Sequence, residues 1–184
     1  MRVVKKPEER RAEMIEAAAK LFVAQGFVHT SVAEIVAAVD VAKGLFYYYF
    51  TTKDDMVKAV LEGFSAHAGA CLEKIANSDL TGQEKVQAVL SCKIWKELAV
   101  TPLFKDLCMP QHTALYADAV ERITEHVAPA MTQVAVQALG EAEKDTRYAQ
   151  DMVRILCHGL MQLARRGELD DAKVNVLVHQ MLGL

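Results

Sequence analysis

Residues 32–50 read VAEIVAAVDVAKGLFYYYF. Two short patterns with a helical period, at 32–39 and 42–49, are separated only by the link Val39-Asp40-Val41. Aspartate tolerates a left-handed backbone better than most residues that carry a side chain, so we expect Asp40 to make the turn. Two short helices joined so tightly have the size and spacing of a helix-turn-helix.

The second of these helices has an uneven distribution of side chains. Five consecutive aromatic residues, 46–50, cannot all lie on one helix face when each residue turns by about 100°. Phe46 and Phe50 are four apart and are predicted to point inward. A different face carries one cation, one glycine and two phenols: Lys43, Gly44, Tyr47 and Tyr48. These groups can donate to phosphates and let a backbone approach closely, so this face suits duplex DNA, whereas an aromatic mini-core leaves Tyr47 and Tyr48 unexplained.

The rest of the chain has apolar residues at helical spacing and no convincing alternation of period two, which predicts an all-α fold with about nine helices. The first helix is expected to begin near Pro7 and end at Gly26. Pro129 is expected to kink or split a long helix at about 112–139. We predict a DNA-binding domain at 1–52, with a basic tail at 1–7, and a second helical domain at 53–184.

Composition narrows the class of protein. Hydrophobic residues make up 52% and charged residues 24% of the 184, which excludes intrinsic disorder. The formal net charge is −3, but the basic residues are enriched at the N-terminal end, where Arg2, Lys5, Lys6, Arg10 and Arg11 oppose only Glu8 and Glu9. This basic end is either an arm that reaches phosphates or a solubilising tail. The uncharged stretch 129–140 is too short to span a bilayer and the N-terminus is charged, so we predict a cytoplasmic protein without membrane contact.

Four elements between residues 18 and 56 occur together in a fixed order. They are Ala18-x-x-Leu21-Phe22-x-x-x-Gly26-Phe27, Thr30-Ser31-Val32-x-x-Ile35, Val41-Ala42-Lys43-Gly44-x-Phe46-Tyr47-x-Tyr49-Phe50 and Lys53-Asp54-Asp55-Met56. With this combination the stretch 17–56 resembles the DNA-binding domain of the TetR family of bacterial transcriptional regulators. The nine-helix arrangement of that family also agrees with the number of helices expected here.

The resemblance implies roles for individual residues. Thr30 or Ser31, Tyr47 and Lys53 would contact phosphates, and Lys43, Leu45 and Tyr48 would lie at bases or in the groove. The predicted DNA-binding residues are Thr30, Ser31, Lys43, Gly44, Leu45, Tyr47, Tyr48, Tyr49 and Lys53. Two departures from the family matter: Ala42 replaces a frequent serine cap, and Leu45 replaces a frequent threonine and can offer only apolar contact, such as to a thymine methyl.

The resemblance also implies that the C-terminal helices bind a small-molecule effector and pair with a second subunit. Aromatic residues and methionines could line an apolar pocket, with His112 or Tyr116 as polar groups, although each residue taken alone is more simply an ordinary core residue. The candidates are Trp95, Phe104, Met109, His112, Tyr116, Met131 and Met152. The candidate dimer interface consists of Ile155, Leu156, Gly159, Leu160, Leu163, Val174, Leu177, Val178 and Met181.

These observations predict a ligand-responsive homodimeric repressor that binds a palindromic operator. An effector would shift the helix that begins at Lys53 and so change the spacing of the two recognition helices. The alternative is an all-α scaffold whose N-terminal bundle has lost DNA binding. No nucleophile motif, phosphate loop or dinucleotide fingerprint is present, and the pairs His67/Cys71 and Cys157/His158 lack further ligands. We therefore predict no catalytic residue, metal or cofactor.

Overall fold

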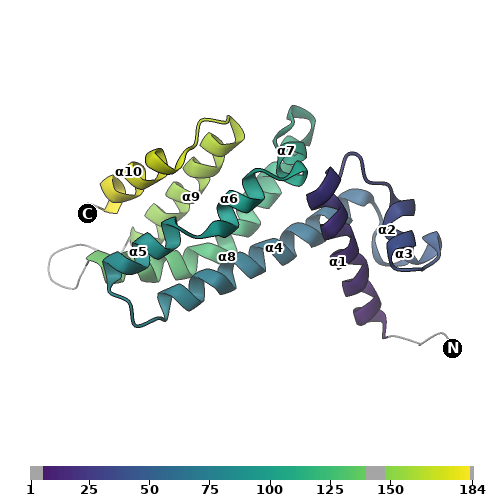
Figure 1. Cartoon of the computed structure of the whole chain (residues 1–184), viewed down its shortest axis with the longest axis horizontal. Helices are drawn as coiled ribbons and strands as arrows, with labels where there is room; N and C mark the ends of the chain where they lie inside the picture. Colours follow the sequence, from purple (N-terminus) through teal and green to yellow (C-terminus); the bar gives the residue numbers. More distant parts are fainter. Residues whose placement is uncertain (1–5, 140–147, 183–184) are drawn as a thin grey trace. The chain divides into compact units, whose positions relative to one another are not determined.

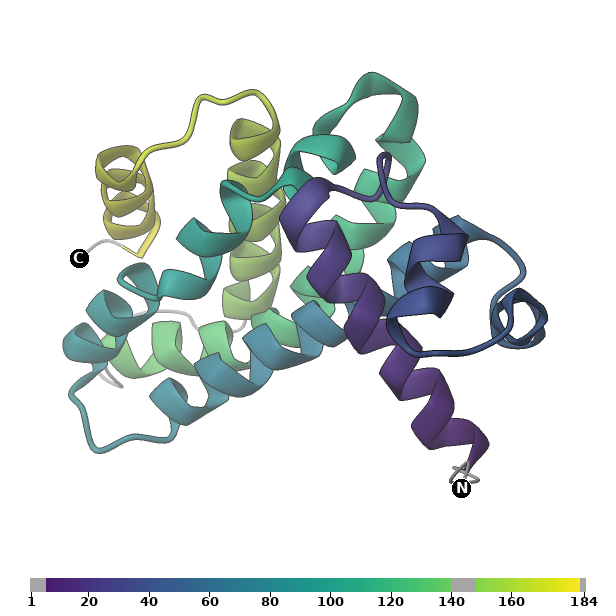
Figure 2. The ribbon, with the colours of Figure 1, turned by 45° about the vertical axis from the view of Figure 1, so that its right-hand side comes forward.

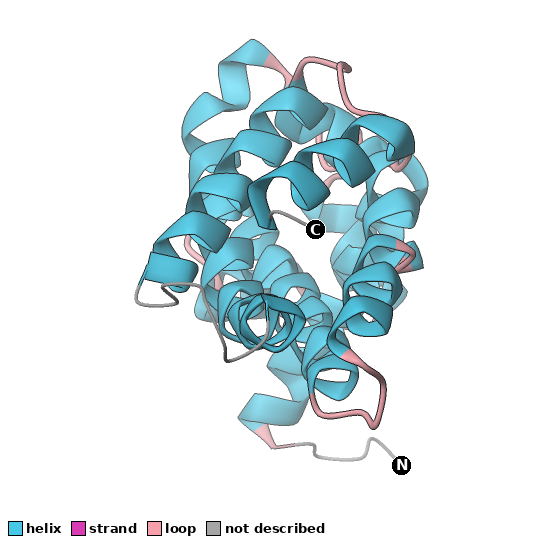
Figure 3. Cartoon of the chain, turned by 90° about the vertical axis from the view of Figure 1, so that its left-hand side faces the viewer, coloured by secondary structure: helices cyan, strands magenta, loops and turns pink. Residues whose placement is uncertain are grey.

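The computed structural model describes residues 6–139 and 148–182, with the backbone alone at 94–96 and 182. This part of the chain is built from helices without any strand (Figures 1 and 3), which confirms the all-α prediction. The elements are α1 (Pro7–Gln25), α2 (Val32–Ala38), α3 (Lys43–Tyr49), α4 (Lys53–Ala76), α5 (Gly82–Leu90), α6 (Lys93–Ala99), α7 (Pro102–Cys108), the 3₁₀ turn η1 (Pro110–His112), α8 (Thr113–Leu139), α9 (Ala149–Arg165) and α10 (Asp171–Leu182).

Two helix boundaries differ from the sequence expectations. Apolar residues at helical spacing, Val86, Val89, Leu90 and Ile94, predict one continuous helix, but the structure divides this stretch at Ser91 and Cys92 into α5 and α6. Neither glycine nor proline marks the break. Conversely, α8 continues through Pro129, so the expected split is wrong. Pro129 and Glu125 are both exposed, so water can satisfy the Glu125 carbonyl that the missing proline N–H leaves without its helical partner.

The helix ends near the N-terminus follow local sequence signals. Gly26 ends α1 with φ 84°, a conformation that strains any residue with a Cβ. Thr52 precedes α4, where its hydroxyl accepts from the Asp55 N–H at 3.1 Å and its own N–H donates to the Asp55 carboxylate at 2.9 Å. Reciprocal bonds of this kind satisfy donors that a helix start leaves open, which explains why α4 begins at Lys53.

The described chain forms two compact units. The first contains the residues up to Gly63 together with Glu97–Ala119, and the second contains Phe64–Lys96 and the residues from Val120 onward. Helix α7 and the first turns of α8 therefore belong with α1–α3, whereas the boundary predicted at residue 52 assigns them to the C-terminal domain. Helices α4 and α8 each contribute residues to both units.

The core of the first unit joins the three N-terminal helices. Met14 and Phe22 from α1, Ile35 from α2 and Phe46 from α3 are completely buried. Helix α1 packs against α2, and α2 against α3 (Figure 2). Because Leu103 of α7 is also fully buried and α7 packs on α1, the N-terminal helices do not close their core alone.

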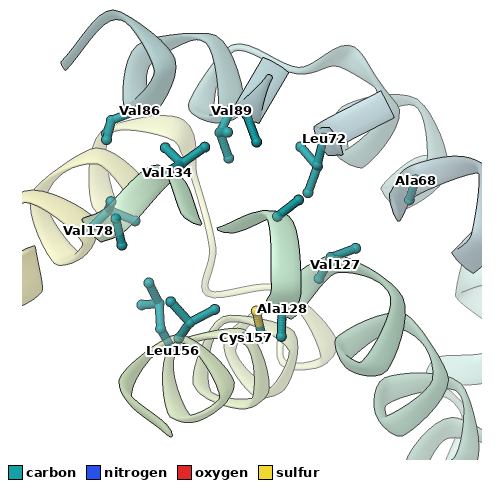
Figure 4. Packing of buried hydrophobic residues seen from close by; sticks show 14 of the residues in the cluster. Ala68, Leu72, Val86, Val89, Val127, Ala128, Val134, Leu156, Cys157 and Val178 are labelled. Carbon is teal, nitrogen blue, oxygen red and sulfur yellow. The ribbon is translucent and has the colours of Figure 1, made fainter. Parts of the chain in front are cut away.

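The core of the second unit is assembled from five helices (Figure 4). Its fully or nearly buried residues include Leu72 of α4, Val86 of α5, Val127 and Ala128 of α8, Leu156 and Cys157 of α9, and Val178 of α10. Helices α4 and α8 approach closely at Gly69, where an added Cβ would collide with the backbone carbonyl of His126. Burial raises the pKa of the Cys157 thiol to about 11, so this cysteine behaves as a small hydrophobic residue.

Candidate nucleic-acid interface

The turn between α2 and α3 has the geometry that the sequence predicts. Asp40 has φ 51°, in the left-handed region. Its N–H donates to the Ala37 carbonyl at 3.2 Å, and the Val41 N–H donates to the Val36 carbonyl at 3.0 Å. These bonds close the end of α2 and direct the chain into α3, so the helix-turn-helix is held by backbone interactions within the six residues 36–41.

The start of α2 is fixed by a capping box. The Ser31 hydroxyl accepts from the Glu34 N–H at 3.2 Å, and the Ser31 N–H donates to the Glu34 carboxylate at 2.7 Å. Gln25 also donates to that carboxylate, at 3.2 Å. The backbone N–H of Ser31, its hydroxyl and the Gln25 amide together hold the pKa of Glu34 below its usual value. The Glu34 carboxylate therefore fixes the start of α2.

Helix α3 is anchored by its inward aromatic side chains, as predicted. Phe46 and Phe50 are buried, with ring centroids 5.5 Å apart. The Arg11 guanidinium lies 5.0 Å from the centroid of the Phe50 ring, a cation–π contact from α1. Ala42, before the first turn, provides no side-chain cap. Tertiary packing of two phenylalanines therefore holds this seven-residue helix, which is too short to be stable by itself.

The outward face of α3 has the composition that the sequence predicts. Tyr47 is 53% exposed and Tyr48 is 75% exposed. Lys43 and Gly44 are also exposed, whereas Leu45 and Tyr49 lie half-buried on the flanks, with the Tyr49 ring 4.9 Å from that of Tyr48. Within the described residues, no hydrogen bond or ion pair holds the Lys43 ammonium. This face presents a lysine and two phenols that packing does not require.

Gly44 allows the fold and the interface to be tested separately. A Cβ at this position would meet no described atom within 4 Å. We expect Gly44→Ala to raise the free energy of unfolding by about 0.5–1 kcal/mol, because alanine is the better helix former. If the Gly44 backbone approaches DNA closely, the added methyl should weaken duplex binding by about 5-fold or more, the cost of a 1 kcal/mol overlap.

Urea unfolding and fluorescence anisotropy measure the two effects of this variant independently. The matched control is Ala37→Gly, the reverse substitution at an exposed position of α2. It should lower the free energy of unfolding and leave the affinity of the folded protein for DNA unchanged. Unchanged DNA affinity in Gly44→Ala would exclude close approach at this position.

The structure corrects the prediction for Thr30. Its side chain is 1% exposed, and its hydroxyl donates to the Gly26 carbonyl at 2.6 Å and accepts from the Gln25 amide at 3.2 Å. A hydroxyl in this position closes the loop between α1 and α2 and is turned away from solvent. Of the two residues considered for this phosphate contact, only Ser31 is exposed.

Lys53 also has a structural partner that the sequence did not indicate. Its ammonium donates to the carbonyl oxygens of Phe27 at 2.8 Å and Thr30 at 3.3 Å. It thereby ties the start of α4 to the segment 26–30. A lysine ammonium has three donors, so a phosphate contact remains a prediction for Lys53, but two of its donors already hold this segment in place.

The same segment is held from α7. Asp106 is 4% exposed, and its carboxylate accepts from the Val28 N–H at 2.8 Å. The carboxylate also fills the space into which a Cβ on Gly26 would project. Phe27 packs with its ring centroid 4.9 Å from that of His112. The α1–α2 loop therefore derives its position from residues near 106–112 as well as from its own helices.

Sequence reasoning did not single out Asp106, although a signal was present. Leu103, Asp106 and Leu107 are spaced to share one face of α7, and both leucines are buried. A carboxylate on an apolar helix face is expected to have a specific polar partner, because burying it without one is costly.

The effector candidates are distributed over both units. Phe104 and Tyr116 are buried with ring centroids 6.5 Å apart, and His112 packs on Phe27, so these three belong to the first unit and contribute to its core. Met109 lies half-buried in the same unit. Met131 lies in the second unit, where its sulfur accepts from the Cys157 thiol at 3.7 Å. The side chain of Trp95 lies outside the described residues.

Met152 lies partly exposed at an apolar hollow in the second unit. Ala135, Leu139, Ala149, Met152, Val153, Leu156 and Met181 line it, and its volume is about 30 Å³. This is room for about one water molecule, which is less than a typical effector occupies. A shared effector pocket for the candidates stays a prediction.

The residues of the candidate dimer interface separate into two sets. Leu156 and Val178 are buried in the core of the second unit, and Leu160, Val174 and Met181 pack against it. Ile155 is 68% exposed, and Gly159 is exposed with open space where a Cβ would stand. Leu163 and Leu177 are half-buried. The outward side of α9 is therefore apolar at Ile155 and open to close approach at Gly159.

Neither a cluster of three or more metal ligands nor a helix that could span a membrane occurs among the described residues. The Cys71 sulfur lies 3.7 Å from Nε2 of His67, but no group of three or more His, Cys, Asp or Glu that could hold a metal occurs within 6–139 and 148–182. In the same ranges, every helix is too short or too polar to cross a bilayer.

Sequence comparisons match part of this chain to known bacterial regulatory proteins. The sequence model of the family described as "Bacterial regulatory proteins, tetR family" matches residues 14–60. The HTH-type transcriptional repressor KstR2 of Mycobacterium tuberculosis (strain ATCC 25618 / H37Rv) is 31% identical over 88 residues, which are 48% of this chain and 44% of KstR2. The HTH-type transcriptional regulator HbdR of Aromatoleum sp. (strain CIB) is 44% identical over 55 residues, 30% of this chain and 24% of HbdR. The matches thus span less than half the length of each relative.

A solved structure extends the similarity of fold to the whole chain. RolR in complex with its ligand resorcinol superposes with a TM-score of 0.69 and 17% identity, covering 96% of this chain and 87% of RolR. At this identity the likeness shows the fold alone. Residues 14–60 therefore belong to the family of bacterial regulatory proteins described as the tetR family, and the chain as a whole has a fold similar to that of RolR.

Proposed function

We propose that this protein is a DNA-binding transcriptional repressor that binds a palindromic operator as a homodimer and is released by a small-molecule effector. Its partners are double-stranded DNA, a second copy of itself and the effector, and it acts in the cytoplasm without a catalytic role. The observation that carries the proposal is the exposed face of α3, on which Lys43, Gly44, Tyr47 and Tyr48 lie. The rings of Tyr47 and Tyr48 contact the neighbouring rings of Phe46 and Tyr49, but more than half of each tyrosine stays exposed.

The arrangement of α3 supports contact with a duplex. An ammonium and phenolic hydroxyls donate to phosphates and base edges, and a helix of this kind fits the major groove of B-DNA. The buried Phe46 and Phe50 hold the helix rigidly enough to present these groups in a fixed geometry. In the proposed function Tyr47 and Ser31 contact phosphates, and Lys43, Leu45 and Tyr48 face the groove.

Dimerisation supplies the specificity that one helix-turn-helix lacks. Two recognition helices about 34–36 Å apart can read successive major grooves of a palindrome. The exposed Ile155 and the open surface at Gly159 support an interface on α9. Val176 on α10 is 54% exposed and offers a second apolar contact.

We expect Ile155→Asp to convert the dimer to a monomer, because two carboxylates would be buried at a twofold axis. Operator affinity should fall by at least about 100-fold, since the second half-site no longer assists the first. Sedimentation equilibrium measures the oligomeric state, and Gln150→Asp, an exposed substitution outside the proposed interface, is the control. A dimeric Ile155→Asp protein would exclude this face as the interface.

Binding to DNA is tested by fluorescence anisotropy against palindromes selected from a random duplex library and from the neighbourhood of the gene. The proposal predicts salt-dependent binding to a selected duplex, weakened by Lys43→Ala and by Tyr47→Phe, which removes a single hydroxyl. Equal affinity for selected and random duplexes would instead favour the all-α scaffold. Release of the labelled duplex by small apolar and phenolic compounds tests the effector.

A further inference from the structure

The exposed part of the helix-turn-helix offers a narrow set of chemical groups to a base. On α2 the exposed residues are Ala33, Glu34, Ala37 and Ala38, and the Glu34 carboxylate is occupied by Ser31 and Gln25. On α3 the exposed residues with polar groups are Lys43, Tyr47 and Tyr48, whereas Tyr49 is half-buried. Reading of base edges is therefore left to α3.

The groups that α3 lacks exclude some base contacts. Adenine is read most specifically by the carboxamide of asparagine or glutamine, and cytosine by a carboxylate that accepts from its amino group. Residues 43–49 contain neither a carboxamide nor a carboxylate. Guanine is read by a cation that donates to O6 and N7, and Lys43 is the one cation of this helix.

The two lysines near the interface, Lys43 and Lys53, differ in the hydrogen bonds that their ammonium groups make. Lys53 donates to the carbonyl oxygens of Phe27 and Thr30, so its ammonium is held at the loop. Lys43 is exposed at the first residue of α3, and the described structure gives its ammonium no partner. Gly44 beside it leaves open space, which allows that end of α3 to enter the groove deeply enough for Lys43 to reach a base.

The apolar part of the same face matches thymine. Tyr48 presents an aromatic ring that is 75% exposed and is set by its edge contact with Tyr49. Thymine is the base whose C5-methyl projects into the major groove, and apolar side chains distinguish it from cytosine through that methyl. The Tyr48 side chain is more exposed than that of Leu45, which is half-buried.

We propose that α3 specifies an operator half-site by one guanine, read at O6 and N7 by Lys43, and by a thymine whose methyl contacts the Tyr48 ring. This inference rests on the proposed function and adds to it the bases that the surface recognises. Tyr47 and Ser31 then position the helix on phosphates and carry little sequence information.

The experiment uses the full chain and a duplex selected from a random library, in which single atoms are then changed. Replacing the guanine by 7-deazaguanine removes the N7 acceptor and preserves base pairing. We expect the affinity for the duplex to fall by about 5- to 10-fold, because the Lys43 contact would lose one of its two acceptors and keep the other. Replacing the thymine by deoxyuridine removes the methyl, with an expected loss of about 3-fold.

The protein variants assign each loss to a side chain. Lys43→Met should bind the guanine and 7-deazaguanine duplexes equally, whereas Lys74→Met, a charge-matched change on the exposed last turn of α4, should retain the difference. Tyr48→Phe should still distinguish thymine from deoxyuridine, and Tyr48→Ala should not. Circular dichroism confirms that each variant is folded.

The outcomes separate this inference from the proposed function. Specific binding that is insensitive to 7-deazaguanine, or a selected half-site without guanine, would overturn the reading by Lys43 while the protein remains a DNA-binding regulator. A 7-deazaguanine penalty that persists in Lys43→Met would assign the guanine to another residue and overturn it as well. Failure to bind any duplex would refute the proposed function itself.

Discussion

Replacing Asp106 by alanine is expected to lower the free energy of unfolding by about 2–4 kcal/mol and to weaken duplex binding. The Asp106 carboxylate accepts from the Val28 N–H at 2.8 Å and is almost completely buried. Alanine leaves this N–H without its acceptor and opens a space beside Gly26. Because α2 follows the segment 26–30 directly, a shift of that segment displaces the helix-turn-helix.

Two further variants distinguish the role of the acceptor from that of bulk or charge. Asp106→Asn keeps a carbonyl oxygen of the same shape and should lie within about 1 kcal/mol of the unmodified protein. Gly26→Ala strains the backbone and collides with the carboxylate, so it should cost less stability in the Asp106→Ala background. Urea unfolding and anisotropy measure both effects. Equal stability of the alanine and asparagine variants would contradict the proposed role of the bond to Val28.

Replacing Lys85 by methionine is expected to lower the free energy of unfolding by about 2 kcal/mol. Lys85 is 6% exposed, and its ammonium donates to the Ala76 carbonyl at 2.9 Å and to the Gln137 side chain at 3.0 Å. A cation at this position satisfies the carboxyl end of α4 and interacts favourably with its dipole. Methionine fills a similar volume but leaves the Ala76 carbonyl with only the longer bond from Gln133, at 3.4 Å.

In a thermal melt, the decrease of about 2 kcal/mol in the stability of Lys85→Met corresponds to a decrease in Tm of about 4–8 °C for a protein of this size. Lys74→Met is the matched control, because Lys74 lies in the last turn of the same helix but is exposed and should change stability by less than about 0.5 kcal/mol. A melting temperature for Lys85→Met equal to that of Lys74→Met would show that the bond to Ala76 contributes little.

Local signals in the sequence predicted much of the N-terminal architecture. The left-handed turn at Asp40, the end of α1 at Gly26 and the inward pair Phe46 and Phe50 all occur as expected. Each depends on residues within about one helical turn, so the composition of a short segment is sufficient to specify it. The break between α5 and α6 has no such signal and was not predicted.

The roles of Thr30, Lys53 and Asp106 depend on partners that lie elsewhere in the chain. Thr30 and Ser31 are adjacent hydroxyl residues, and only packing shows that the first is buried and the second exposed. Lys53 bonds a carbonyl 26 residues away, and Asp106 bonds an N–H 78 residues away. No periodicity or motif encodes such pairs.

The helical fold, the helix-turn-helix and the outward face of α3 can be predicted from the amino-acid sequence, because periodicity, caps and turn residues act over a few neighbouring positions. Which polar groups near that face are available to DNA, and which hold the protein together, depends on the packing of the folded chain. A buried donor or acceptor must find a partner, and only folding brings distant partners together.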